Sequence, residues 1–229
     1  MRFDELADRM AELARDLRSQ TSAELTMNHI VEAAVDLVGP CEHAGITIAH
    51  RDGQIDSAAV SSKVPVRSDE LQQEFAEGPC VDAAWDQRLV RVPDLAHDER
   101  WPRWAPRAST ELGIGSLLCV QLFTHEHQMG ALNLFSSQTD QFDADAEDEA
   151  LAIAAHAAVA VAAAQNIDQL QVGLARRTVT GQATGMLMER YQLDSQQAFE
   201  VLRRTSSQTN RKIYHISSEI VERRRTEGL

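Results

Sequence analysis

The C-terminal part of the sequence concentrates basic side chains that could contact the phosphates of a nucleic acid. Residues 166 to 229 include ten Arg or Lys and seven Asp or Glu, a balance of +3, whereas the preceding part has twelve basic and twenty-eight acidic residues, a balance of −16. This asymmetry favours a segment that faces a polyanion, although the whole chain carries −13. Arg203, Arg204, Arg211 and Lys212 bracket a predicted helix junction, where they could neutralise phosphates. A solvated charged face is the alternative interpretation.

Three cysteines offer a second kind of chemistry. Cys41, Cys80 and Cys119 are far apart and form no CxxC pair, which argues against a disulfide scaffold or a zinc site and favours a reducing, cytoplasmic compartment. Thiol redox chemistry needs a thiolate with a second thiol within reach, so Cys80 and Cys119 are the candidates for a redox enzyme or sensor. Cys119 lies in an apolar strand, where an inert core residue is the competing interpretation.

Aromatic residues in the middle of the chain could line a ligand pocket. Trp85, Trp101, Trp104 and Phe135 could surround an unknown small molecule together with the two cysteines, although each of them is also typical of a protein core. The sequence has no P-loop, HExxH motif, nucleophile elbow or dinucleotide fingerprint. We therefore expect no enzyme, no metal site and no recognisable cofactor.

The elements that must position these residues predict an α+β chain with an antiparallel sheet flanked by helices. Alternating apolar stretches predict strands at 44–50, 54–61, 89–92, 116–124 and 129–136. We predict helices at 21–38, from Ser68, before Gly113, and in one long run from about Asp140 to Leu193. The Asp194 and Gln197 pair predicts the start of a further helix, and Asn210 the start of the last one.

Two apolar patterns with steps of three and four residues indicate helices that pair with other helices. We predict a coiled-coil or bundle seam, and from it a homodimer, through Phe3, Leu6, Met10, Leu13 and Leu17 and through Ala163, Ile167, Leu170 and Leu174. The longest apolar run, at 150–164, is too short to span a bilayer, and the N-terminus lacks the apolar segment of a signal peptide. We therefore expect no membrane partner.

The tail resembles an ANTAR domain, a three-helix RNA-binding module of bacterial antitermination regulators. The matching marks are Arg177, GQATG from Gly181, MLMER from Met186, Ala198-Phe199, Leu202-Arg203-Arg204, Ser206 and Asn210-Arg211-Lys212. The family usually has a lysine where Thr184 stands. The resemblance implies stem-loop mRNA as the partner, an indirect link to the transcription machinery, and RNA contacts by Arg177, Thr184, Arg190, Arg203, Arg204, Asn210, Arg211 and Lys212.

The preceding part resembles a GAF domain of the kind fused to ANTAR modules. The marks are EGPCVDA from Glu77, RVPDL from Arg91, RWPRWAPRA from Arg100 and GALNLFS from Gly130. The expected organisation is an N-terminal helix at 1–20, a GAF-like sensor domain at 21–165 and an ANTAR-like domain at 166–229 whose first helix continues the last GAF helix. The expected function is RNA-binding antitermination under the control of a signal. The alternatives are a GAF-type thiol redox enzyme or sensor using Cys80 and Cys119, and a DNA-binding regulator.

Overall fold

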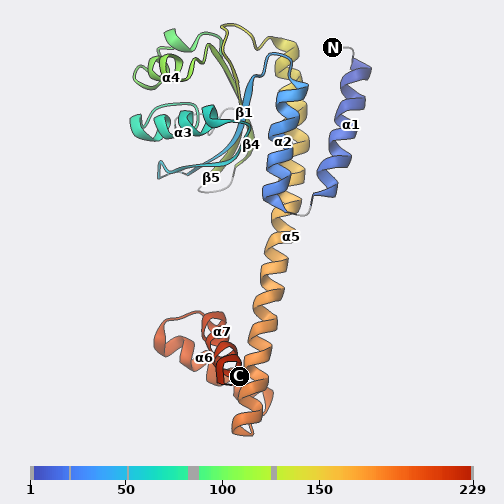
Figure 1. Cartoon of the computed structure of the whole chain (residues 1–229), viewed down its shortest axis with the longest axis vertical. Helices are drawn as coiled ribbons and strands as arrows, with labels where there is room; N and C mark the ends of the chain where they lie inside the picture. Colours follow the sequence, from blue (N-terminus) through green and yellow to red (C-terminus); the bar gives the residue numbers. More distant parts are fainter. Residues whose placement is uncertain (1–2, 21, 51, 82–87, 125–127, 228–229) are drawn as a thin grey trace. The chain divides into compact units, whose positions relative to one another are not determined.

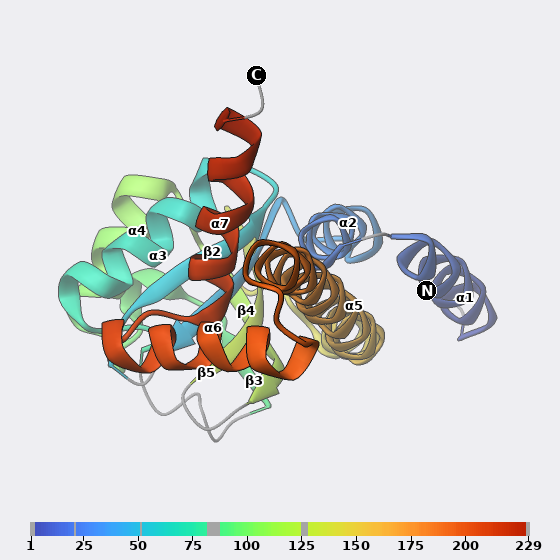
Figure 2. The same ribbon diagram turned by 90° about the horizontal axis from the view of Figure 1, so that it is seen from below.

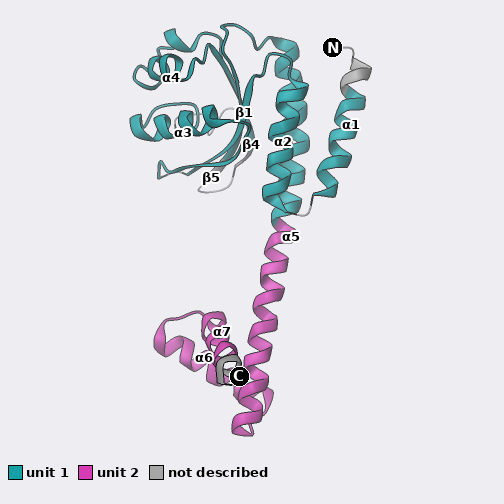
Figure 3. Ribbon diagram, viewed as in Figure 1, with its two compact units in different colours: residues 1–165 teal, residues 166–229 magenta. Residues whose placement is uncertain are grey.

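The computed structural model in Figure 1 describes residues 3–20, 22–50, 52–81, 88–124 and 128–227. The chain divides into two compact units, Met1–Gln165 and Asn166–Leu229, which Figure 3 shows in separate colours. The first unit combines an antiparallel sheet with helices, and the second is helical. The predicted α+β class with its all-helical C-terminal region is confirmed.

The sheet of the first unit has five antiparallel strands in the order β2-β1-β5-β4-β3. Its strands are β1 (His43–His50), β2 (Ile55–Val60), β3 (Leu89–Val92), β4 (Ser116–Thr124) and β5 (Gln128–Ser136). The strands occur where alternating and β-branched stretches predict them. Register shifts interrupt the β1–β2 pairing at Ile46/Thr47 and the β4–β5 pairing at Gln121/Phe123.

Helices cover both faces of this sheet, and Figures 1 and 2 agree on the layers. On one face lie α2 (Ala23–Leu37) and the first part of α5 (Ala144–Tyr191), with α1 (Phe3–Ser19) outside α2. On the other face lie α3 (Lys63–Phe75), the short helix η2 (Leu95–His97) and α4 (Trp104–Leu112). Because side chains alternate along a strand, each inner strand supplies both cores: Leu118 and Val120 face α2 and α5, whereas Leu117 and Cys119 face α3 and α4.

Three predicted helix ends differ from those in the structure. The side chain of Ser22, not Thr21, caps α2 by accepting a hydrogen bond from the Leu25 amide. Helix α3 starts at Lys63, five residues before the predicted start at Ser68, because Ser62 caps it and Pro65 is tolerated in a first helical turn. Asn210 ends α6 (Ser195–Thr209) in a left-handed conformation with φ 51°, so it does not cap α7 (Ile213–Glu227).

Helix α5 runs without interruption over 48 residues. Inside the first unit its fully buried Ile153, Ala157 and Val161 face the sheet and α2. One of its stretches is apolar and long enough to cross a bilayer by composition alone, a test that buried core helices also pass. In the second unit the same helix contributes Ala183 and Leu187 to a small core completed by residues of α6 and α7, namely Ala198, Leu202 and Ile216.

Candidate nucleic-acid interface and buried thiol site

Two arginines of α6 share one carboxylate. Arg203 donates to Glu200 through Nε at 2.7 Å and Nη2 at 2.9 Å, and Arg204 donates to it through Nε at 3.2 Å. Both arginine side chains remain largely exposed, at 67% and 75%. The hydrogen bond from Arg203 is the main reason that the pKa of Glu200 falls to about 2. These cations are thus displayed to solvent while they are partly neutralised by their own helix.

The connection between α6 and α7 carries the other predicted cations. Arg211 forms a bidentate ion pair with Glu219 of α7, with Nη2–Oε1 at 2.6 Å and Nη1–Oε2 at 3.2 Å. The Ser206 hydroxyl donates to the Arg211 carbonyl at 2.5 Å. This hydrogen bond fixes the turn that carries Arg211 and Lys212. Lys212 is exposed, and in the part of the chain that the structure describes it has no ion-pair partner.

The remaining predicted RNA contacts differ in how available their side chains are. Arg177 and Arg190 are exposed on α5, and the Arg190 guanidinium lies 5.9 Å from the centre of the Tyr191 ring. Thr184 is half-buried and its hydroxyl donates to the Thr180 carbonyl at 2.8 Å, so it presents no free donor. Asn210 is exposed, but its left-handed backbone also has the structural role of ending α6. All eight predicted residues lie in the second unit.

The predicted pocket residues form a closed core between the sheet and the helices α3 and α4. Cys80, Trp101, Trp104, Cys119 and Phe135 are each at most 4% exposed and belong to one cluster. The two indoles pack edge to face with ring centres 5.4 Å apart, and the Trp104 Nε1–H donates to the Ser68 carbonyl at 3.3 Å. Trp85 lies outside the described residues. The other five side chains lie in one core cluster, and a ligand pocket among them stays a prediction.

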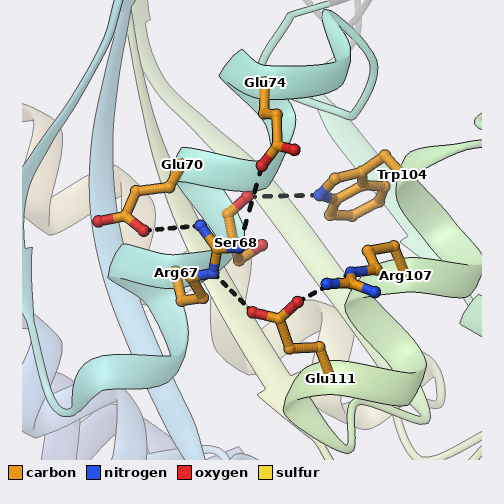
Figure 4. Close-up of polar contacts among 7 residues, drawn as sticks. All are labelled: Arg67, Ser68, Glu70, Glu74, Trp104, Arg107 and Glu111. Atoms are coloured by element: carbon orange, nitrogen blue, oxygen red, sulfur yellow. Dashed lines mark hydrogen bonds and ion pairs between the residues drawn. The ribbon is translucent and has the colours of Figure 1, made fainter.

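An ion-pair cluster fastens the two helices that cover this core. Figure 4 shows Arg67 of α3 between three carboxylates, with Nε 2.7 Å from Glu111 of α4 and Nη1 2.9 Å from Glu70. Glu111 also accepts from Arg107 Nε at 2.9 Å. The carboxylates of Glu111 and Glu70 raise the pKa of Arg67, so its charge is permanent. The cluster joins α3 to α4 at the surface.

Residues 77–80, which we call the EGPC stretch, follow α3 and have a structural role. The Glu77 carboxylate accepts from the backbone N–H groups of Arg103 at 2.8 Å and Trp104 at 3.1 Å, and so caps α4. The Arg103 side chain donates to the same carboxylate at 2.6 Å and lowers the pKa of Glu77. Gly78 has φ +132°, and a Cβ there would lie 2.4 Å from the Gln72 Oε1. This position therefore favours glycine twice, by backbone conformation and by lack of space.

Beneath this stretch lies a closed ring of hydrogen bonds, which we call the Asp69 ring: Thr47, Asp69, Gln72, Cys80 and Asn133. Asp69 accepts from Thr47 at 2.8 Å and from Gln72 at 3.3 Å. Gln72 accepts from the Cys80 amide at 2.9 Å. Asn133 donates to Thr47 at 2.9 Å, and its carboxamide contacts the Cys80 sulfur at 3.6 and 3.8 Å. The ring joins β1, α3, the EGPC stretch and β5 inside the protein.

Asp69 is a buried acid whose hydrogen-bond donors are neutral. Besides Thr47 and Gln72, the Ser57 hydroxyl of β2 donates to it at 2.7 Å. Burial raises the pKa of Asp69 to about 6, and the hydroxyls of Ser57 and Thr47 moderate the rise. The irregular β1–β2 pairing sets Thr47 opposite Ser57, so that both hydroxyls reach one carboxylate oxygen.

Cys80 and Cys119 approach each other at this ring. Cys119 on β4 is the cross-strand partner of Asn133 on β5, and the Asn133 carboxamide touches the Cys80 sulfur. A hydrogen bond between the two thiols, together with burial, raises the pKa of Cys80 well above its ordinary value. The structure therefore brings together two cysteines that lie 39 positions apart in the sequence.

The two predicted dimer seams differ in the single chain. Met10, Leu13 and Leu17 of α1 are at most 6% exposed and belong to the core of the first unit, so their spacing marks a bundle within one chain and not a free seam. The side chains of Phe3 and Leu6 lie outside the described part. Ala163 and Ile167 are exposed, and Leu170 and Leu174 are 73% and 67% exposed, as a pairing surface requires.

Sequence reasoning missed Asp69, Gln72, Asn133 and Glu77. Asp69 lies in the first turn of the helix predicted from Ser68, where an acidic residue is ordinary. Asn133 interrupts the apolar GALNLFS strand, and this is the signal that could have marked a buried polar partner. Nothing in the sequence indicates that these distant polar residues share one site.

Comparison with known proteins assigns both units. The model of the GAF domain family matches residues 20–162, and that of the ANTAR domain family matches residues 168–221. No curated protein matches the chain. Among solved structures, the GAF domain of an Acinetobacter phosphoenolpyruvate-protein phosphotransferase has a TM-score of 0.55 at 16% identity, covering 72% of this chain and 98% of its own.

Two further solved structures are similar. The free methionine-R-sulfoxide reductase of Neisseria meningitidis, solved with its substrate, has a TM-score of 0.53 at 17% identity and covers 72% of this chain and 95% of its own. The bacteriophytochrome RpBphP3 of R. palustris has a TM-score of 0.57 at 9% identity, and the match covers 82% of this chain and 43% of the bacteriophytochrome chain. At these identities the likeness shows the fold alone. With its GAF fold and the two domain matches in this order, the chain belongs to the family of GAF–ANTAR regulators.

Proposed function

We propose that this regulator is a cytoplasmic transcription antitermination protein that binds stem-loop mRNA through residues 166–229 and receives its signal in the GAF domain. The observation that carries the proposal is the ANTAR match over residues 168–221, which coincides with the basic part of an acidic chain. Arg203, Arg204, Arg211 and Lys212 are exposed there. Guanidinium groups can hold phosphates bidentately and can stack on unpaired loop bases, which suits a folded RNA.

The route from signal to RNA in this proposal is α5. It belongs to both units and has no break between Ala144 and Tyr191. We infer that two copies pair along the exposed Ile167, Leu170 and Leu174, so that a change in one GAF domain alters how two ANTAR domains meet an RNA. The protein acts in this proposal as a binding protein and not as an enzyme.

The test is binding of the full chain to a pool of stem-loop RNAs with randomised loops. The double variant Arg211→Ala with Lys212→Ala should lose about 2 kcal/mol or more of binding free energy, because two phosphate contacts disappear. The double variant Lys63→Ala with Arg88→Ala removes the same charge from two exposed residues of the GAF domain and should bind as the unchanged chain does. Equal binding by both double variants would contradict the assigned surface.

DNA binding by the helical tail is the second candidate, since the same cations attract any nucleic acid. Competition between duplex DNA and stem-loop RNA at matched salt separates the two. We expect RNA to displace DNA, and preferential retention of duplex DNA would favour the other reading. A thiol-dependent reductase is less well supported, because both thiols are at most 3% exposed and leave a bulky substrate no access to the sulfur atoms.

A further inference from the structure

We propose that Cys80 and Cys119 form a redox-active dithiol site, which a hydroperoxide converts into a disulfide inside the GAF domain. The chemistry belongs to the GAF domain alone. Its use as the input signal rests on the proposed RNA-binding function.

The placement brings two thiols from different elements into contact. The strand register sets Cys119 opposite Asn133, and directly opposed residues in an antiparallel pair have Cβ atoms about 5 Å apart. The Cys80 sulfur lies against the Asn133 carboxamide at 3.6 Å to Nδ2 and 3.8 Å to Oδ1, and both cysteines belong to the same buried cluster. Both thiols thus adjoin the side chain of Asn133, and a disulfide requires their Cβ atoms to come within about 3.8 Å of each other.

The surroundings of Cys80 are polar, unlike those of an ordinary buried cysteine. Its amide is held by Gln72 and its sulfur by Asn133, and both partners belong to the Asp69 ring. Cys41 is the internal comparison. It is also buried, but its thiol donates to the His43 carbonyl at 3.2 Å, and burial raises its pKa to about 12. Cys41 is therefore a structural thiol, whereas Cys80 forms a pair with Cys119.

The exposure of the two sulfurs assigns the two steps of the reaction. Cys80 is 0% exposed and Cys119 is 3% exposed, so the Cys119 sulfur is the one that attacks the hydroperoxide. It takes the terminal oxygen of the hydroperoxide. The O–O bond breaks, and the alcohol leaves with one proton. The Cys80 sulfur then attacks the Cys119 sulfenic acid, and the Cys80 proton leaves with the hydroxyl as water. Two thiols and one hydroperoxide thus yield one disulfide, one alcohol and one water.

Burial sets the expected speed and selectivity. Cys80 is 0% and Cys119 3% exposed, so hydrogen peroxide should react more slowly than it does with an exposed thiol, and bulky thiol reagents should not react in the folded chain. Formation of the disulfide would remove the Cys80 S–H group from Asn133 and would link the EGPC stretch covalently to β4. Because Glu77 in this stretch caps α4, the change reaches the helices that cover the site.

The experiment maps disulfides in the reduced, purified full chain after treatment with hydrogen peroxide and alkylation under denaturing conditions. We expect a Cys80–Cys119 disulfide within one chain, with Cys41 recovered as an alkylated free thiol. Cys41→Ser should form the same disulfide, and Cys119→Ser should form none. Free thiols at both positions, or pairing with Cys41 or with another chain, would overturn the proposal. The mapping of the unchanged chain requires no variant to fold.

A second measurement tests the role as input. The affinity of the oxidised chain for the stem-loop RNA pool should differ from that of the reduced chain by about fivefold or more, the usual scale of coupling between sites. A mapped disulfide with unchanged RNA affinity would overturn the input role alone. Absence of RNA binding in both states would count against the proposed function and would leave the disulfide result standing.

Discussion

Arg203, Arg204 and Arg211 each have a carboxylate partner in their own domain, and this pairing limits how strongly they can attract a phosphate. Glu200 accepts from the first two and Glu219 from the third. These pairs are exposed, so each contributes little to stability. They can orient the guanidinium groups before RNA arrives, and they must be exchanged for phosphate oxygens when it binds. The carboxylates thus act as internal competitors.

We predict that Glu200→Gln strengthens RNA binding. The change removes the charge that neutralises Arg203 and Arg204 but keeps the size of the side chain, so affinity should rise by up to about fivefold, the scale of an exposed ion pair. Filter binding at constant salt measures it. Glu99→Gln makes the same charge change at an exposed residue of the GAF domain and serves as the control. A gain of similar size in that control would mean that net charge alone is responsible.

The protonation of Asp69 makes the stability of the GAF domain depend on pH. Because its pKa in the folded protein is about 6 against an ordinary 3.8, the folded state holds a proton that the unfolded state has already lost between these values. The stability from this proton is fully present below pH 4, and it is lost as pH rises to about 6. A shift of this size corresponds to about 3 kcal/mol.

We predict that Asp69→Asn removes most of this pH dependence. The carboxamide stays neutral, so the free energy of unfolding of the GAF domain should change less between pH 4 and pH 7 than it does in the unchanged chain. All three tryptophans precede residue 166, so their fluorescence during urea unfolding reports on this domain. Glu99→Gln should retain the slope. An equal slope in Asp69→Asn would assign the proton to another group, such as the buried Glu149, whose pKa burial also raises.

At the scale of elements, the exposed stripe of α5 is the feature that a single chain leaves uncovered. Val159, Leu170 and Leu174 are 67–73% exposed, which is costly for apolar side chains on an isolated helix. The seam at α1 is different, since its described apolar residues are already buried. Of the two heptad-like patterns, only the one on α5 therefore supports a homodimer.

We predict that Leu170→Arg shifts the protein from dimer to monomer. The side chain is solvent-exposed in the single chain, so the fold should persist while two like charges oppose each other across the proposed seam. Sedimentation at tens of micromolar measures the result. Val172→Arg lies two residues away, on the opposite side of the helix, and should leave the dimer intact. A monomeric unchanged chain at that concentration would remove the dimer proposal.

At the scale of the whole molecule, the charge distribution opposes non-specific binding. The residues before 166 carry −16 and those from 166 carry +3, so a polyanion is repelled by most of the protein and attracted by one end. A chain of this composition should bind RNA by a few well-placed contacts and not by a broad basic surface.

We therefore predict a modest but measurable salt dependence. The logarithm of the RNA affinity should fall linearly with the logarithm of salt concentration, and Arg211→Ala with Lys212→Ala should lower the slope by about 1.5, since each single-strand phosphate contact contributes about 0.7. Lys63→Ala with Arg88→Ala should leave the slope unchanged. If the two double variants gave the same slope, phosphate contact by Arg211 and Lys212 would be excluded.

Much of the fold follows from local patterns in the sequence. Alternating apolar residues mark β1, β4 and β5, the Asp194 and Gln197 pair forms the predicted capping box of α6, and α5 continues to Tyr191 as its uninterrupted periodicity indicates. The motifs of the two domains are also local, and both domain matches agree with them. These features depend on interactions between residues that are close in the sequence, so they can be predicted from it.

Tertiary structure decided which residues meet. Met10, Leu13 and Leu17 have the spacing of a dimer seam, yet packing of α1 against α2 buries them, since spacing defines a face and not its partner. Cys80 and Cys119, 39 positions apart, come together only because β4 pairs with β5 and Asn133 bridges the gap to the EGPC stretch. Asp69 acquires its raised pKa from burial among residues of β1, β2 and α3. Burial and long-range contact are properties of the packed chain, so only the packed chain shows them.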